Sequence, residues 1–211
     1  MTGDRVIDGR LRVLDALIRS RRMVRNFRDE SVPPDVVDHL LDLARRAPSA
    51  GNTQPWEFLV LTDDARQRYW ATTLGERRSS FRWQGLLHAP VLIVVYVRPD
   101  AYTDRYAEPD KASTGLGQGP DSWPVPYWWV DGGAAVEHLL LGAVAVGLGA
   151  CLFGQFEHEG AVRDAFGVPA DRRAAGTIAM GVPAADEPGR SASRRRPPLD
   201  DVVHRQRWRQ S

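Results

Sequence analysis

Three clusters in the 211-residue chain contain residue types that bind anions or polar heterocycles. Arg21, Arg22 and Arg25 lie close enough together to present several guanidinium groups to one anion, and each group offers a planar fork of N–H donors. The segment 49–55 is rich in turn formers and carries side-chain amides and hydroxyls that are able to bond a polar ring. A third cluster, 194–196, is a run of three arginines near the C-terminus.

Each cluster taken alone also has an ordinary structural interpretation. The first arginines are compatible with a solvated basic face, and the segment 49–55 is compatible with the entry to a strand through Asx-type turns. The run 194–196 is compatible with a charged terminus. The residues by themselves leave these alternatives open.

Together, the order and content of the three clusters resemble the nitroreductase family of flavoproteins. The resemblance rests on the runs RRMVRNF (21–27), APSAGNTQPW (47–56) and RRRPPL (194–199), of which the second is the most specific. It extends from Arg21 to about Val203. It implies an α+β fold: a three-layer α/β/α sandwich with a mostly antiparallel sheet flanked by helices. It also implies a homodimer that exchanges a terminal extension and binds FMN at its interface.

The same resemblance assigns the basic residues to the cofactor. Arg21 and Arg22 would hold the phosphate side of FMN, joined by Arg194 and Arg196 from the tail. Arg25 would lie near the N1 and O2 edge of the flavin ring. A fixed cation there favours the reduced flavin, which tends to carry negative charge at N1.

Two further groups of residues would complete the flavin site. The partner subunit would contact the ribityl chain and the ring through Pro48, Ser49, Asn52 and Gln54. The end of a strand would lie against the ring through Leu152, Phe153 and Gly154, and the backbone N–H of Gly154 would face N5.

Two positions depart from the pattern of the family. Met23 also belongs to the cofactor-binding set, but many members have a serine there that is able to bond the phosphate. We therefore expect the phosphate to depend more on arginines or on backbone donors. At Phe153 some members have a polar residue, so this contact would use the backbone or ring packing.

The implied function is reduction of electron-poor acceptors, such as nitroaromatics and quinones, at the expense of NADH or NADPH. The expected mechanism is a ping-pong hydride transfer in which the nucleotide and the acceptor occupy the same slot in turn. It needs no acid or base from the protein, so no catalytic side chain is predicted. Reductive dehalogenation, dehydrogenation in secondary metabolism and oxidative breakdown of FMN are alternatives on the same fold.

Composition argues against other classes of protein. The net charge is +1, from 28 basic and 27 acidic residues, which disfavours an Arg-rich nucleic-acid-binding protein. The five histidines show no paired spacing such as H-E-x-x-H, so no metal site is expected. Cys151 is the single cysteine, and the N-terminus lacks an apolar signal core. We therefore expect a cytoplasmic protein without a membrane span.

The hydrophobic pattern predicts the elements that must position these clusters within one domain, 1–211. Helices are expected to end at the first arginine cluster, to run between the prolines 33–34 and 48, and to cover 63–74, 131–146 and 159–166. Strands are expected at 56–61, 90–97, 150–153 and 176–181, with the first two central in the sheet. Asp131 is a candidate N-cap.

Two segments fit no regular pattern. The stretch 98–129 is rich in glycine, proline and aromatic residues, and we interpret it as a structureless lid. Its aromatics, Trp123, Tyr127, Trp128 and Trp129, would either cover the slot over the flavin or pack at the dimer interface. The stretch 183–211 is expected to be a C-terminal extension that packs on another surface.

Overall fold

A four-stranded antiparallel sheet forms the centre of the computed structural model, which describes residues 8–185, 189 and 193–208. The strands follow the order β1-β2-β4-β3. Their bounds are β1 (Trp56–Leu61), β2 (Val91–Val97), β3 (Gly149–Phe153) and β4 (Arg173–Gly181). All four predicted strands are confirmed, and so is the α+β class. The central place predicted for 56–61 is wrong, because β1 is an edge strand and β4 lies beside β2 at the centre.

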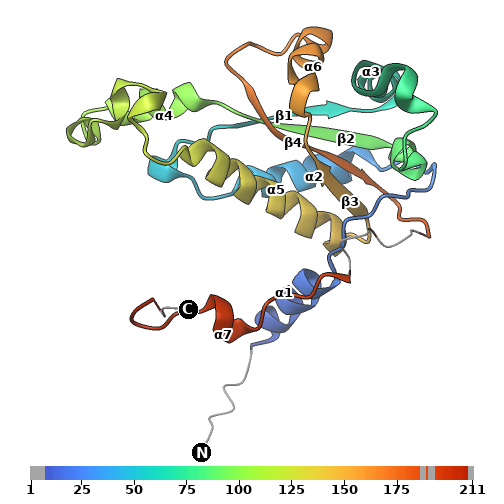
Figure 1. Ribbon diagram of the computed structural model, residues 1–211, viewed down its shortest axis with the longest axis horizontal. Helices are drawn as coiled ribbons and strands as arrows, with labels where there is room; N and C mark the ends of the chain where they lie inside the picture. The colour runs from blue at the N-terminus through green and yellow to red at the C-terminus, as the bar shows by residue number, and fades with distance from the viewer. Residues whose placement is uncertain (1–7, 186–188, 190–192, 209–211) are drawn as a thin grey trace, which may run out of the picture.

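Helices cover both faces of the sheet and give three layers (Figure 1). Residues of β2 point alternately to the two sides: Ile93 packs in one core cluster with Leu40 and Leu139, and Leu92 in another with Tyr69. All seven residues of β2 are therefore buried. The covering helices are α2 (Pro34–Ala44) and α5 (Tyr127–Ala145) on one face, and α3 (Asp63–Leu74) and α6 (Glu159–Phe166) on the other.

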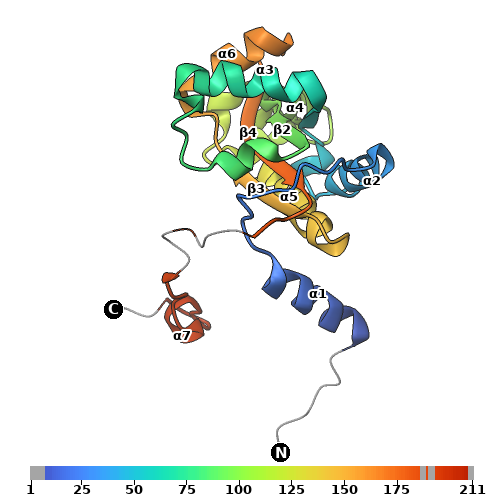
Figure 2. The same ribbon diagram turned by 90° about the vertical axis from the view of Figure 1, so that its right-hand side faces the viewer.

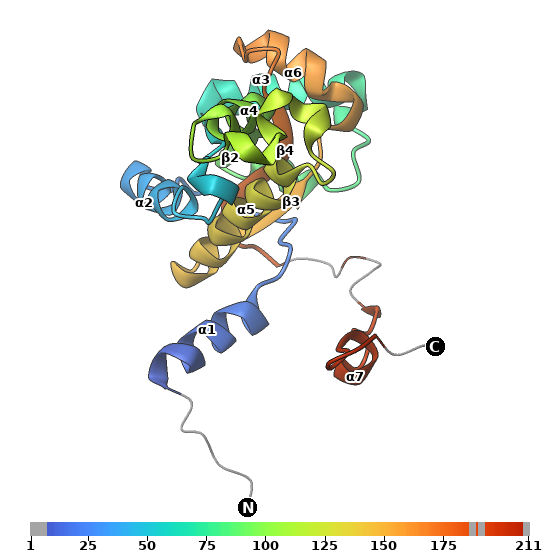
Figure 3. The ribbon, with the colours of Figure 1, turned by 90° about the vertical axis from the view of Figure 1, so that its left-hand side faces the viewer.

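Two terminal helices stand apart from the layered body (Figures 1, 2 and 3). They are α1 (Gly9–Ser20) and the short α7 (Leu199–Val202). No residue of α1 is buried. Four of its apolar residues are each 45 to 61% exposed: Leu11, Val13, Leu14 and Ile18. The predicted extension 183–211 is described only in part, since 186–188, 190–192 and 209–211 lie outside the described residues.

The segment 98–129 is not structureless as predicted. It forms α4 (Pro99–Ala107) and the short 3₁₀ helices η4 (Ala112–Thr114), η5 (Leu116–Gln118) and η6 (Pro120–Ser122). Pro99 starts α4, a position that suits proline because its missing N–H is not needed there. The segment also has a small apolar core of its own, in which Tyr102, Trp123 and Trp128 are buried against Val97.

The predicted role of Asp131 as an N-cap is also wrong, because α5 begins four residues earlier at Tyr127. Pro126 occupies the N-cap position and Asp131 lies inside the helix. Its carboxylate is buried and accepts hydrogen bonds from other parts of the chain. Within the described part of the chain, no helix has the length and apolarity required to cross a membrane.

Candidate functional site

The first arginine cluster lies along the outer edge of β3. Met23 forms a parallel bridge with Ala150, and the backbone N–H of Val24 donates to the Ala150 carbonyl over 3.0 Å. The N–H of Leu152 points to the Met23 sulfur at 3.5 Å. Residues from two distant parts of the sequence, 21–25 and 149–154, are thus fixed side by side by backbone pairing.

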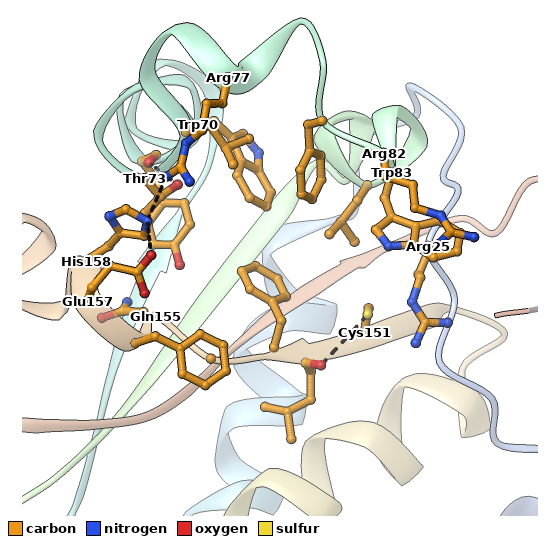
Figure 4. Close-up of a pocket in the computed structure, with 18 of the residues that line it drawn as sticks. Arg25, Trp70, Thr73, Arg77, Arg82, Trp83, Cys151, Gln155, Glu157 and His158 are labelled. Atoms are coloured by element: carbon orange, nitrogen blue, oxygen red, sulfur yellow. Dashed lines mark hydrogen bonds and ion pairs between the residues drawn. The ribbon is translucent and has the colours of Figure 1, made fainter. Parts of the chain in front are cut away.

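A cavity of about 530 Å³ opens beside this edge (Figure 4). Arg25 and the end of β3, from Cys151 to Gly154, form one part of its lining. The end of α3 and the turns that follow it form the opposite part. The volume falls in the range of sites that bind small molecules and cofactors, roughly 300 to 1,000 Å³.

Aromatic rings line the cavity and give it flat apolar walls. Trp70 and Phe153 are stacked, with ring centroids 5.6 Å apart and an angle of 18° between the planes. The Phe81 ring is tilted towards Trp70, with ring centroids 6.4 Å apart. The Phe156 ring packs against Gly154 and is 82% exposed. Such walls suit a planar aromatic ligand.

Cationic side chains occupy two ends of the cavity (Figure 4). The guanidinium groups of Arg25 and Arg82 lie 5.1 and 4.6 Å from the centre of the Trp83 ring. At the other end, Nη2 of Arg77 lies 3.2 Å from Nε2 of His158. The cavity therefore favours a ligand with negative charge or electron-rich oxygen atoms at its edges.

Several buried polar atoms in this region have no hydrogen-bond partner among the described residues. They include Nε1 of Trp70 and Oε1 of Gln155, both in the lining of the cavity, and Nη1 of Arg21 at the end of α1. The closest ion pair of Arg21 joins its Nε to Oε1 of Glu137 over 3.9 Å. Buried polar groups are normally satisfied, so these atoms suit a ligand that supplies both acceptors and donors.

A buried phenol forms part of the cavity wall. The Tyr69 hydroxyl shares a hydrogen bond of 2.8 Å with Thr177 Oγ1, and burial raises the pKa of Tyr69 to about 12. Tyr69 therefore stays neutral at physiological pH. Among the described residues, no group of three His, Cys, Asp or Glu side chains is placed to hold a metal ion.

Comparison with known proteins identifies the type of site. A family model described as the nitroreductase family matches residues 18–182, which include the arginine cluster, the sheet and the cavity. The chain belongs to the nitroreductase family. It is therefore an oxidoreductase of the NAD(P)H-dependent nitroreductase type.

Individual relatives of this nitroreductase-family chain have different reactions in their names. A 4-nitrobenzoate reductase of a Nocardioides species is 30% identical, over 92% of this chain and 90% of its own length. A 5,6-dimethylbenzimidazole synthase of Rhodospirillum rubrum is 31% identical, over 83% of this chain and 84% of its own. A nitroreductase-type protein of Desulfovibrio desulfuricans, solved in complex with FMN, is 28% identical with a TM-score of 0.67. That match covers 93% of this chain and 98% of the other.

Part of the predicted nitroreductase site comes together within one chain. Arg25 lies beside Leu152, Phe153 and Gly154 in the lining of the cavity. The chain that leaves β4 also passes this point, since the Ala184 N–H donates to the Asn26 carbonyl over 3.0 Å. Arg22 is exposed and donates to the carbonyl of Arg19, in the last turn of α1.

The remaining predicted residues lie elsewhere. Pro48, Ser49, Asn52 and Gln54 immediately precede β1, on the opposite edge of the sheet from β3, and none of them lines the cavity. Arg194 and Arg196 are exposed on the segment that leads to α7, away from the body of the protein (Figure 2).

Sequence reasoning missed the wall of the cavity that follows α3. This wall includes Trp70, Arg77, Phe81, Arg82 and Trp83. The mixture of arginine and aromatic residues between 77 and 83 was the available signal, because such mixtures are common where flat anionic ligands bind. No regular spacing accompanies it, so the sequence alone does not distinguish this turn from an ordinary surface turn.

Proposed function

We propose that the protein binds FMN in this cavity and uses NADH or NADPH to reduce electron-poor aromatic acceptors such as nitroaromatics and quinones. The main support is the combination of aromatic walls, flanking arginines and buried donors that have no partner among the described residues. When bound, FMN accepts a hydride from the nicotinamide and passes reducing equivalents to the acceptor. The protein residues supply binding, orientation and charge.

The residues present fit this cofactor. Arg21 has a buried Nη1 without a partner among the described residues, which suits a phosphate oxygen. Arg25 at the cavity suits the N1 and O2 edge, where a cation favours the reduced ring. Met23 has no hydroxyl, so in this proposal Arg21 and Arg22 bind the phosphate, with Arg194 and Arg196 reaching it from the tail. Leu152, Phe153 and Gly154 lie against the ring.

We further propose a homodimer with FMN at its interface. The apolar side chains of α1 are exposed, and so are Leu199, Val202 and Trp208 around α7. Exposed apolar residues gathered on projecting helices favour burial against a second copy. The partner subunit would then place its Pro48, Ser49, Asn52 and Gln54 against the flavin. This arrangement explains why the segment lies far from the cavity of its own chain.

The proposal is tested by purifying the protein and recording its absorbance at roughly 300 to 550 nm, the range in which a flavin cofactor absorbs. A yellow protein, or a colourless one that acquires the flavin spectrum on addition of FMN, supports it. A protein that stays colourless with added FMN contradicts it. Light scattering then gives the mass in solution, and a monomer contradicts the shared site.

A second reaction is suggested by the relative named 5,6-dimethylbenzimidazole synthase, which has an identity similar to that of the 4-nitrobenzoate reductase over a smaller share of the chain. The alternative is oxidative breakdown of the flavin itself. Steady-state turnover of NADH or NADPH with nitrobenzoates, quinones and halophenols distinguishes the reductases. Catalytic loss of added FMN in air, under the same reductants, would instead identify a flavin-degrading enzyme.

A further inference from the structure

We propose that Asp131 is a positioning residue that holds the segment 49–54 in the shape required by the flavin of the partner subunit. The inference rests on the proposed FMN function and extends it to a residue outside the cavity. Asp131 touches neither the cavity nor, in this proposal, the cofactor. It acts through the backbone of the segment 49–54, which in this proposal contacts the cofactor.

The Asp131 carboxylate joins three parts of the chain. It is 7% exposed, and its Oδ2 accepts a hydrogen bond of 2.8 Å from the backbone N–H of Ala50 and one of 2.5 Å from the Tyr102 hydroxyl. Asp131 belongs to α5, Tyr102 to α4 and Ala50 to the short helix η1 (Ala50–Asn52). The carboxylate therefore links the flavin segment to two neighbouring helices.

The segment needs such support because its backbone is strained. Gly51, Asn52 and Gln54 all have positive φ angles, of 63°, 55° and 52°. This region is uncommon for residues with a side chain, and neighbouring structure must enforce it. Positive φ at two non-glycine residues so close together indicates that the surrounding contacts determine the shape of the segment.

Helix α4 supplies the second part of this support. Nε of Arg105 donates to the Gly51 carbonyl over 2.9 Å, and the guanidinium is itself held by both carboxylate oxygens of Asp110, at 2.8 and 2.9 Å. The Tyr106 ring packs directly on Gly51, where an added Cβ would lie 2.9 Å from the ring. The first part of the segment 98–129 thus serves as a rigid support for the loop.

The support leaves the side chains of the loop available. Ala50 and Gly51 use their backbone groups internally, and the Gln54 N–H is satisfied by Ser49 Oγ at 2.9 Å. The side chains of Asn52 and Gln54 are exposed, with Nε2 of Gln54 donating to Oδ1 of Asn52 over 3.3 Å. A pair of amides presented in this way suits the carbonyl and imide edge of a flavin or the hydroxyls of its ribityl chain.

Burying the Asp131 carboxylate is costly, so its hydrogen bonds must offset that cost. Its observed donors are neutral, and no cation pairs with it among the described residues. A buried carboxylate without a cation costs more than a neutral amide or an apolar residue at the same place. The carboxylate accepts a short hydrogen bond from the Ala50 amide, which fixes the start of the loop.

The first experiment measures FMN and riboflavin binding to Asp131→Ala by quenching of flavin fluorescence. We expect both dissociation constants to rise by on the order of tenfold, because the loop contacts parts that the two ligands share. Asp131→Asn keeps an acceptor for the Ala50 amide and should give an intermediate value. Arg105→Gln, which removes the hydrogen bond from Arg105 Nε to the Gly51 carbonyl, provides a second test if Asp131→Ala does not fold.

Arg66→Gln is the matched control. Its Nη1 donates to the carbonyls of Leu87 and Ala89, so the variant loses hydrogen bonds of similar kind outside the loop and outside the cavity. It should lower the melting temperature without changing flavin binding. Hydrogen exchange of the apo-protein gives a readout without cofactor: the Ala50 amide should exchange faster in Asp131→Ala and at the wild-type rate in Arg66→Gln.

A mixed dimer tests whether the loop acts on the partner. When Asp131→Ala chains are combined with Arg21→Ala chains, an action across the interface leaves one site of the mixed dimer with neither change. Tight FMN binding should therefore return in part on mixing. If the loop acted within its own chain, both sites would carry one defect and mixing would restore nothing.

The outcomes separate this inference from the proposed function. A wild-type protein that does not bind FMN contradicts the proposed function. Wild-type binding together with unchanged flavin affinity in Asp131→Ala, or an unchanged exchange rate at Ala50, overturns the role of Asp131 alone. Failure of the mixed dimer to restore binding overturns its action across the interface.

Discussion

Replacing Arg21 with alanine should weaken FMN binding without destabilising the apo-protein. Nη1 of Arg21 is buried without a partner among the described residues, and Nε lies 3.9 Å from Glu137, whose side chain is 49% exposed. Losing such an ion pair costs up to about 1 kcal/mol, whereas removing an unsatisfied buried donor returns about 1–3 kcal/mol. The free energy of unfolding of the apo-protein should therefore stay constant or rise.

The bound state behaves in the opposite way. A hydrogen bond between an arginine and a phosphate oxygen contributes about 1.5–3 kcal/mol, so the dissociation constant for FMN should rise roughly 10- to 150-fold. Riboflavin lacks the phosphate and should bind Arg21→Ala and the wild type equally. Fluorescence titration measures both ligands, and urea unfolding measures the apo-protein. The control is Arg45→Ala, which removes an exposed ion pair with Asp42. Equal weakening of FMN and riboflavin, or FMN affinity within about twofold of wild type, would refute the assignment.

Three other predictions follow from the site and from the projecting helix. Arg25→Ala should slow flavin reduction by NAD(P)H in stopped-flow measurements, by roughly tenfold or more, and an unchanged rate would remove its role at the ring. The double variant Leu14→Asp and Ile18→Asp should give a monomer with weak FMN binding by light scattering and titration, because it places charge on the exposed apolar face of α1. Burial raises the pKa of Tyr69 from 10.0 to about 12, so its stabilisation is complete below pH 10 and is lost as the pH rises towards 12. Between these values the wild type should lose about 2 kcal/mol more unfolding free energy than Tyr69→Phe in urea titrations, and equal losses would contradict this.

Local patterns in the sequence were enough to predict most elements of the fold. The uninterrupted apolar run of β2 and the periodic apolar stripes of α1 and α2 can be recognised locally, since each depends only on neighbours in sequence. The place of β1 at an edge depends on which strands pair, and β4 reaches the centre from a distant part of the chain. The helix α4 was missed because its stability depends on burying Tyr102 against Trp123 and Trp128, contacts between residues far apart in sequence.

The candidate site was also predictable only where motifs in the sequence define it. The resemblance of motifs predicted that residues 21–25 and 152–154 serve one ligand, and the bridge between Met23 and Ala150 shows how they meet. The wall that contains Trp70 and Trp83 follows from the way the turn after α3 folds back towards β3, and the mixture of arginine and aromatic residues in that turn does not by itself predict the fold-back. Asp131 was predicted to cap its own helix, whereas its carboxylate accepts hydrogen bonds from Ala50 and Tyr102. A carboxylate near the start of a helix suits an N-cap equally well until its tertiary partners are known.

The placement of the motifs at opposite edges of one sheet argues for a site made by two chains. The loop before β1 and the cavity beside β3 are separated by the two central strands, or about 14 Å at the usual spacing between strands. Side chains as short as those of Ser49 and Asn52 do not cover that distance within one chain. A two-fold axis would bring the β3 edge of one copy to the loop of the other. A shared cofactor would then bind the buried Arg21 donor, which has no partner among the described residues, and the amides of the loop. The same contact would bury the apolar face of α1. The three features then have one cause, and each is altered by a different substitution.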